Sequence, residues 1–139
     1  METFQLQTGD FDCGPAALRG ALQLLGRHVS LRDLTRWAGT TPARGTPAAG
    51  LKRTLERLGV TFREYTSKSR LQAWKWARRQ TAPAVLSFDD DEHWVLLCAG
   101  LGRTVVIFDP EIGVQVYARK DFLRRWVTGG RVYALQLVR

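Results

Sequence analysis

The sequence predicts one α+β domain over residues 1–139, with helices first and a mostly antiparallel sheet after them. Two observations carry this prediction. In the first half, apolar residues recur at helical spacing, as at Leu18, Leu22 and Leu25, whereas from Pro83 onward short apolar runs are separated by turn residues. A chain of 139 residues is also long enough to build a hydrophobic core without disulfides or a metal.

Each predicted helix has a start or stop signal. The first begins at Cys13 and ends before Gly26, and Ser30 opens a short second helix that ends near Trp37. The pair Thr46-Pro47 suits the start of a third helix, which Gly59 terminates. Ser69 can cap a fourth. The predicted helices cover residues 13–25, 30–37, 46–58, 70–79 and 121–126.

The predicted strands are short, apolar and bounded by turn residues. They cover residues 60–65, 84–88, 93–99, 104–108, 114–117 and 132–138. The run Asp89-Asp90-Asp91-Glu92 lies between two of these strands and lacks the alternating ligand spacing of a calcium loop, so it predicts a solvated turn.

Composition excludes several classes of protein. The two cysteines are too few for a disulfide framework, and we expect both to be reduced thiols in a cytoplasmic protein. Residues 1–5 lack the basic start and apolar run of a signal peptide, and no apolar run approaches the 18 residues of a membrane span. We therefore expect no membrane span and no attached transporter.

The formal net charge of +8 is concentrated in one segment. Residues Lys52–Arg79, called the basic segment below, contain nine basic and two acidic side chains. Such a surface attracts acidic peptides, nucleic acid or anionic lipid without much selectivity. A solvated helix face without a partner explains the same composition, and we rank nucleic acid below an acidic leader peptide as a partner of this segment.

Cys13 is the first candidate for chemistry. Gly9, Asp10 and Asp12 precede it and favour a turn, so the cysteine begins a helix. Unpaired N–H groups and the positive end of the helix dipole stabilise a thiolate there. A small buried hydrophobe at a helix start is the alternative interpretation of a lone cysteine.

His93 and Asp109 are predicted to meet across a hairpin. If residues 100–102 form a three-residue loop ending in a left-handed Gly102, Ala99 pairs with Arg103 and His93 stands opposite Asp109. Opposed side chains share a face, close enough for the carboxylate to hold one imidazole nitrogen. The other nitrogen would be free to exchange a proton with a nearby thiol.

These residues carry a family resemblance. Gln7, six residues ahead of Asp12-Cys13-Gly14, followed by the small-residue helix and by His93 and Asp109, resembles the papain-like cysteine peptidases that process bacteriocin leader peptides after a double glycine. The resemblance implies a papain-like fold with N-terminal helices packed on the sheet. It also implies Cys13 as nucleophile, His93 as general base and then acid, Asp109 as orienter, and Gln7 with the Cys13 N–H as donors to the oxyanion.

The resemblance covers nearly the whole chain and has one departure. Transporter-linked members usually carry a residue other than proline after the Cys-Gly step, whereas Gly14-Pro15-Ala16 resembles stand-alone relatives, whose substrates vary. We expect Gly14, which leaves space beside the sulfur, and Trp94 to contact the substrate. No cofactor or metal is expected.

The sequence thus predicts a thiol peptidase that cleaves a peptide or leader sequence after Gly-Gly or Gly-Ala through an acyl-enzyme on Cys13. Two alternatives stay open. The same three side chains could serve an amidase or acyl transferase, because water and amines compete for one thioester. The domain could also be a peptidase-like module without catalysis that holds an acidic protein, an acidic leader peptide or nucleic acid on the basic segment.

Overall fold

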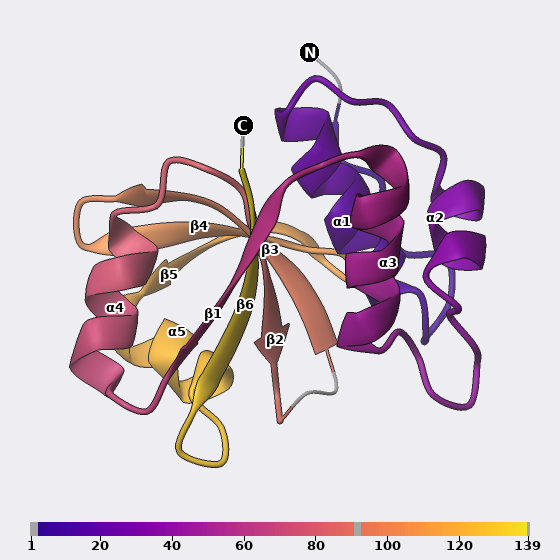
Figure 1. Cartoon of the computed structure of the whole chain (residues 1–139). Coiled ribbons are helices and arrows are strands. Elements are labelled where there is room, and N and C mark those ends of the chain that lie inside the picture. Colours follow the sequence, from indigo (N-terminus) through magenta and orange to yellow (C-terminus); the bar gives the residue numbers. More distant parts are fainter. Residues whose placement is uncertain (1–2, 91–92, 139) are drawn as a thin grey trace.

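A computed structural model describes residues 3–90 and 93–138 of the chain. Its helices lie on both sides of one twisted sheet (Figure 1). The helices of the first half, α1 (Cys13–Leu24), α2 (Leu31–Trp37) and α3 (Ala48–Leu58), gather on one side. Two others, α4 (Arg70–Arg78) and α5 (Arg119–Trp126), cover the opposite side. The predicted α+β order is confirmed, and all five helices start and end within a few residues of their predicted bounds.

The sheet has six strands in the order β1-β6-β2-β3-β4-β5, and each neighbouring pair is antiparallel. The strands are β1 (Phe62–Ser67), β2 (Ala84–Phe88), β3 (His93–Leu101), β4 (Thr104–Asp109), β5 (Gly113–Ala118) and β6 (Val132–Leu137). One strand from the helical half, β1, therefore pairs with the last strand and forms an edge of the sheet.

Alternating side chains of the central strands fill two separate cores. In β3, Leu96 packs in the cluster that contains α1, while Val95 and Leu97 pack in the cluster that contains α4 and α5. Because both faces of the central strands are covered, β2 is buried at every position and most of β3 is apolar at consecutive positions. No helix in the described part of the chain is both long enough and apolar enough to cross a bilayer.

The predicted register of the β3–β4 hairpin is wrong. Leu101 pairs with Thr104, so the turn contains two residues instead of three. A bulge at Cys98 then shifts the register by one, and Leu97 pairs with Ile107. Continuing this register places Val95, and not His93, opposite Asp109. His93 is the diagonal neighbour of Asp109 on the same face, a separation that long side chains still bridge.

The turn before β3 is only partly described, since Asp91 and Glu92 lie outside the described residues. Asp89 and Asp90 both have a left-handed backbone, with φ of 53° and 60°. Aspartate is one of the few residues other than glycine that adopt this conformation readily, so the acidic composition suits the turn.

Candidate active site

Cys13 is the first residue of α1 and is 6% exposed. The small residues after it allow this end of the helix to pack closely, and Pro15 fits in the first turn, where its missing N–H removes no helical hydrogen bond. The backbone N–H of Trp94 donates to the Cys13 sulfur at 3.4 Å. A peptide N–H and a helix N-terminus therefore both face the sulfur, and both stabilise negative charge there.

His93 lies between this sulfur and Asp109. Its Nε2 is 2.6 Å from the Asp109 carboxylate, which leaves Nδ1 as the nitrogen able to exchange a proton with a thiol. Burial alone would lower the pKa of His93, but hydrogen bonds to Asp109 and Cys13, together with their charges, outweigh burial and raise it to about 10. The arrangement favours an imidazolium beside the sulfur.

The Asp109 carboxylate is buried and held in place by several groups. Besides its bond to His93, it accepts a hydrogen bond from the Glu111 backbone N–H at 3.0 Å, and Arg125 lies 3.8 Å from its other oxygen. Burial would raise the pKa of Asp109, but the bonds from His93 and Glu111 and the charges of His93 and Arg125 lower it. Asp109 is thus kept ionised.

Gln7 lies in the loop ahead of α1, in the wall of a cavity of about 270 Å³ that His93 also lines. Its backbone N–H donates to the carbonyl oxygen of Pro110, the residue after Asp109, at 2.8 Å. Its side-chain Nε2 donates to the Gly9 carbonyl at 2.7 Å, while Oε1 is buried and has no hydrogen-bond partner among the described residues. One hydrogen of the Nε2 amide thus remains for another acceptor.

Asp12 holds the same loop, a role that the sequence interpretation missed. It stands at the N-cap position of α1 but does not cap the helix with its side chain. Its carboxylate instead accepts from the backbone N–H groups of Thr8 and Gly9 and from the Thr8 hydroxyl, at 2.6 to 3.2 Å. Asp12 therefore fixes the loop that carries Gln7.

Gly14 and Trp94 lie beside Cys13 and are both buried. A β-carbon at Gly14 would come within 2.7 Å of the Thr46 side chain, so Thr46 occupies the space that the absent side chain leaves. The indole Nε1 of Trp94 donates to the Thr46 carbonyl at 2.8 Å. Trp94 and Thr46 also line a cavity of about 350 Å³, and a role of Gly14 and Trp94 in substrate binding stays a prediction.

Arg125 is a second residue that the sequence analysis missed. From α5 it forms a two-point ion pair with Asp89, through Nε at 3.0 Å and Nη2 at 2.5 Å, and its Nη1 donates to the Tyr117 hydroxyl at 3.0 Å. Its backbone carbonyl also accepts from the Asp89 N–H at 2.9 Å. Arg125 therefore ties the turn that leads into His93 to the neighbourhood of Asp109.

We predict that Arg125→Met lowers the free energy of unfolding by about 2 kcal/mol, because it leaves Asp89 without its charged partner and the Tyr117 hydroxyl without its donor. Arg125→Lys should lose less. Arg124→Met is the matched control, since its 3.6 Å pair with Asp121 is largely exposed and should contribute less than about 0.5 kcal/mol. Urea titration of the three variants checks this, and equal losses at positions 124 and 125 would contradict it.

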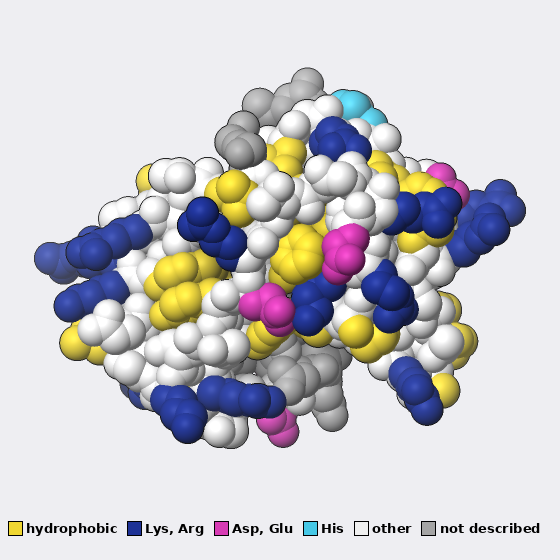
Figure 2. All heavy atoms as spheres, in the orientation of Figure 1, with side chains coloured by type: hydrophobic (Ala, Val, Ile, Leu, Met, Phe, Trp, Pro, Cys, Tyr) yellow, Lys and Arg dark blue, Asp and Glu magenta, His cyan; other side chains and the backbone are white. Residues whose placement is uncertain are grey.

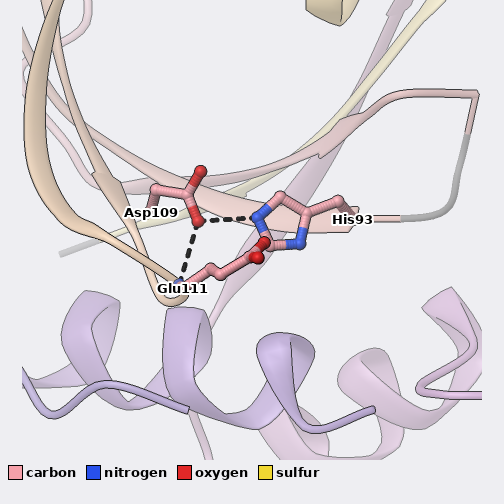
Figure 3. Close-up of side chains that lie close together, drawn as sticks. All are labelled: His93, Asp109 and Glu111. Atoms are coloured by element: carbon pink, nitrogen blue, oxygen red, sulfur yellow. Dashed lines mark hydrogen bonds and ion pairs between the residues drawn. The ribbon is translucent and has the colours of Figure 1, made fainter. Parts of the chain in front are cut away.

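One group of side chains has metal-ligand character. The ligand atoms of His93, Asp109 and Glu111 all lie within 4.8 Å of one another, and the Glu111 carboxylate lies beside the imidazole (Figure 3). A metal on this group would have to displace a proton from an imidazole whose pKa is raised to about 10, which weakens binding near neutral pH. A protonated imidazole that is hydrogen-bonded to Asp109 therefore fits these residues better than a metal site.

Cys98 differs from Cys13 in its surroundings. Both cysteines are free thiols, but Cys98 occupies the bulge in β3 and is half-buried. Burial raises the pKa of Cys98 to about 11, so this thiol stays protonated and unreactive near neutral pH.

The basic segment is spread over α3, β1 and α4. Figure 2 shows its face of the molecule, where Lys and Arg side chains stand in separate groups with apolar and acidic side chains between them. Lys52 and Glu64, both within the segment, form an ion pair at 3.2 Å, and Arg57 stacks on the Trp37 ring. The segment is therefore not one continuous basic patch, which weakens the interpretation of this domain as a nucleic-acid module.

Comparisons with known proteins find peptidases among the proteins that this chain resembles. A model of the peptidase C39 family matches residues 2–132. An uncharacterized protein of Methanothermobacter marburgensis is 29% identical over 128 residues, which are 92% of this chain and 84% of that protein. The lactococcin-G-processing and transport ATP-binding protein LagD of Lactococcus lactis is 25% identical over 126 residues, which are 91% of this chain but 18% of LagD.

Solved structures show the same fold. The peptidase domain of Streptococcus ComA, a bifunctional ABC transporter of a quorum-sensing pathway, superposes with a TM-score of 0.77 at 21% identity and 98% coverage of both chains. A double glycine motif protease from an AMS/PCAT transporter, in complex with the leader peptide, gives 0.78 at 20% identity, covering 96% of this chain and 89% of that one. The papain-like α+β architecture is thereby confirmed.

Proposed function

The chain belongs to the peptidase C39 family, and we propose that it is a cysteine peptidase that cleaves a peptide or leader sequence after a Gly-Gly or Gly-Ala pair. One observation carries the proposal: His93 Nε2 lies 2.6 Å from the Asp109 carboxylate, and the backbone N–H of the next residue, Trp94, donates to the Cys13 sulfur at 3.4 Å. A thiol, a base and an orienting carboxylate in this order are the parts that nucleophilic acyl transfer needs.

The first step joins the enzyme to the substrate. The Cys13 thiolate attacks the carbonyl carbon of the bond to be cleaved, and the electron pair of the C=O bond moves to oxygen. The backbone N–H of Cys13 and the free Nε2 hydrogen of Gln7 donate to this oxyanion. The hydrogen bonds that the loop of Gln7 donates to the Asp12 carboxylate and to the Pro110 carbonyl keep the amide in position.

The second step releases the first product. The His93 imidazolium gives its proton to the leaving nitrogen as the carbon–nitrogen bond breaks, and a thioester remains on Cys13. Water then attacks the thioester carbonyl while the neutral imidazole, held by Asp109, takes its proton. The carbon–sulfur bond breaks, which releases the carboxylic acid product and restores the Cys13 thiolate. We place this chemistry in the cytoplasm, where Cys13 and Cys98 would stay free thiols.

The preference for small residues follows from the position of the sulfur. Cys13 is 6% exposed, with Trp94 on one side and Thr46 packed over the neighbouring Gly14, so a substrate backbone must come very close to react. Small residues before the cleaved bond would let the substrate carbonyl approach this recessed sulfur most closely. LagD and the leader-peptide complex of the transporter protease support the same choice.

The proposal is tested with a peptide that contains Gly-Gly and matched peptides that carry Gly-Val or Val-Gly in its place. Mass spectrometry should show one cut, after Gly-Gly, at least about 100-fold faster than any cut in the valine peptides. Added hydroxylamine should capture the acyl group as a hydroxamate, which reports the thioester. Equal cutting of the three peptides would contradict the small-residue preference, and no cutting of any would contradict the peptidase proposal.

A further inference from the structure

The cavity beside His93 carries negative charge that the catalytic steps do not use. We propose that this cavity receives the residue that follows the cleaved bond, and that Glu111 and Asp10 make the enzyme select a basic side chain at that position. The inference rests on the peptidase function proposed above and names a feature of its substrate.

The chemistry of the second step decides which side of the sulfur the leaving group occupies. The leaving nitrogen must lie within hydrogen-bond reach of the imidazole that protonates it, while the acyl carbon stays on Cys13. The chain that follows this nitrogen therefore extends over His93. The cavity of about 270 Å³ that includes His93 in its wall is lined further by Gln7, Asp10, Asp89 and Glu111, and its size suits one side chain.

The carboxylates of this cavity are not equally compensated. Asp89 is neutralised by Arg125 in its two-point ion pair. Asp10 and Glu111 form no ion pair with any residue in the ranges 3–90 and 93–138. Glu111 is fixed through its backbone, which donates to Asp109, and its exposed carboxylate lies at the imidazole (Figure 3). Glu111 thus has only the His93 imidazolium as a cationic neighbour, and Asp10 has no ion-pair partner in these ranges.

A second cavity near Cys13 has the reverse polarity. The cavity lined by Trp94 and Thr46 is bordered by Arg44 and Arg131, and none of the described residues that line it is acidic. Trp94 and Thr46 both lie against the Cys13–Gly14 step, so this cavity is the one next to the acyl side of the cleaved bond. Charge therefore changes sign across the sulfur, from basic on the acyl side to acidic on the leaving side.

This asymmetry predicts a measurable preference. Three peptides that share a Gly-Gly sequence and differ only in the next residue, lysine, glutamine or glutamate, should be cleaved with kcat/KM falling in that order. An exposed or half-exposed charge pair changes binding by a factor of up to about five, so two carboxylates should separate the lysine and glutamate peptides by about tenfold or more at low salt. Raising the salt concentration to about 0.5 M should shrink the ratio.

Variants assign the preference to its residues. Glu111→Gln and Asp10→Asn should each reduce the lysine-to-glutamate ratio about threefold, and the double variant should nearly abolish it. Glu56→Gln, the same change on an exposed residue of α3 that lines neither cavity, should leave the ratio as in the wild type.

The outcomes separate this inference from the proposed function. If the wild type cleaves all three peptides at equal kcat/KM, the charge selection is wrong and the peptidase stands. If the ratio survives in the Glu111→Gln, Asp10→Asn double variant, the selection comes from elsewhere and the assignment to this cavity is wrong. If none of the peptides is cleaved, the peptidase proposal fails and the inference fails with it.

Discussion

Cys13→Ala should lower kcat for the Gly-Gly peptide by about ten-thousand-fold or more, because loss of the nucleophile removes the thioester route altogether. The variant should keep its fold. Alanine is smaller than cysteine by one sulfur, and three of the four residues after Gly14 in α1 are already small, namely Pro15, Ala16 and Ala17. The free energy of unfolding should fall by about 1 to 2 kcal/mol at most, from the small cavity left at a buried site.

Cys98→Ala is the matched control for this prediction. The wild type should react with iodoacetamide at one thiol near neutral pH, because the Cys98 thiol, with its pKa raised to about 11, is almost wholly protonated. Labelling and turnover should therefore persist in Cys98→Ala and vanish in Cys13→Ala. If both variants were labelled and active like the wild type, Cys13 would not be a special thiol and the proposed mechanism would be wrong.

The elements were predictable from the sequence because their signals are local. Helix starts such as Ser30 and Ser69 do accept hydrogen bonds from the third backbone N–H of their helices, and Gly59 ends α3 with a φ of 70°. Strand β2 matches its predicted bounds, residues 84–88. These features depend on residues within one turn or one strand, where propensity and capping decide the outcome.

The register of β3 and β4 was not predictable in the same way. Without the extra residue at Cys98, the observed two-residue turn would place Leu96 opposite Asp109 and turn His93 to the other face. The predicted three-residue turn and the observed turn with a bulge have the same parity, and both bring His93 to the face of Asp109. The sequence therefore predicted the correct pair of side chains from an incorrect register. No local signal in the sequence marks a bulge at a cysteine.

The residues that support the site were missed because their partners are distant in sequence. Arg125 and Asp89 are 36 residues apart, and an arginine on a short amphipathic helix gives no sign of which carboxylate it meets. The approach of Cys13 to strand β3 is likewise tertiary, because Cys13 and Trp94, whose N–H donates to the sulfur, are 81 positions apart in the sequence. Only the family resemblance, and not spacing, indicated that approach.

Asp109→Asn should lower kcat/KM for the Gly-Gly peptide by about 100-fold to 10,000-fold at pH 7, because an amide cannot stabilise the His93 imidazolium as a carboxylate does. The hydrogen bond and charge of Asp109 oppose the effect of burial on the pKa of His93. In the variant, the effect of burial is opposed less strongly. The pKa of His93 should therefore fall well below 10, and the imidazolium–thiolate pair should be lost at a lower pH.

The pH profile distinguishes this effect from simple damage to the fold. The alkaline limb of kcat/KM should lie near pH 10 in the wild type, where His93 loses its proton, and should move to lower pH in Asp109→Asn. The pH dependence of the free energy of unfolding should report the same change in the pKa of His93. A raised pKa means that the charge of His93 stabilises the fold fully below about pH 6.5 and that this contribution is lost as pH rises toward 10. Between about pH 6.5 and pH 10, the free energy of unfolding should fall less in Asp109→Asn than in the wild type. An unchanged alkaline limb would show that Asp109 does not act through His93.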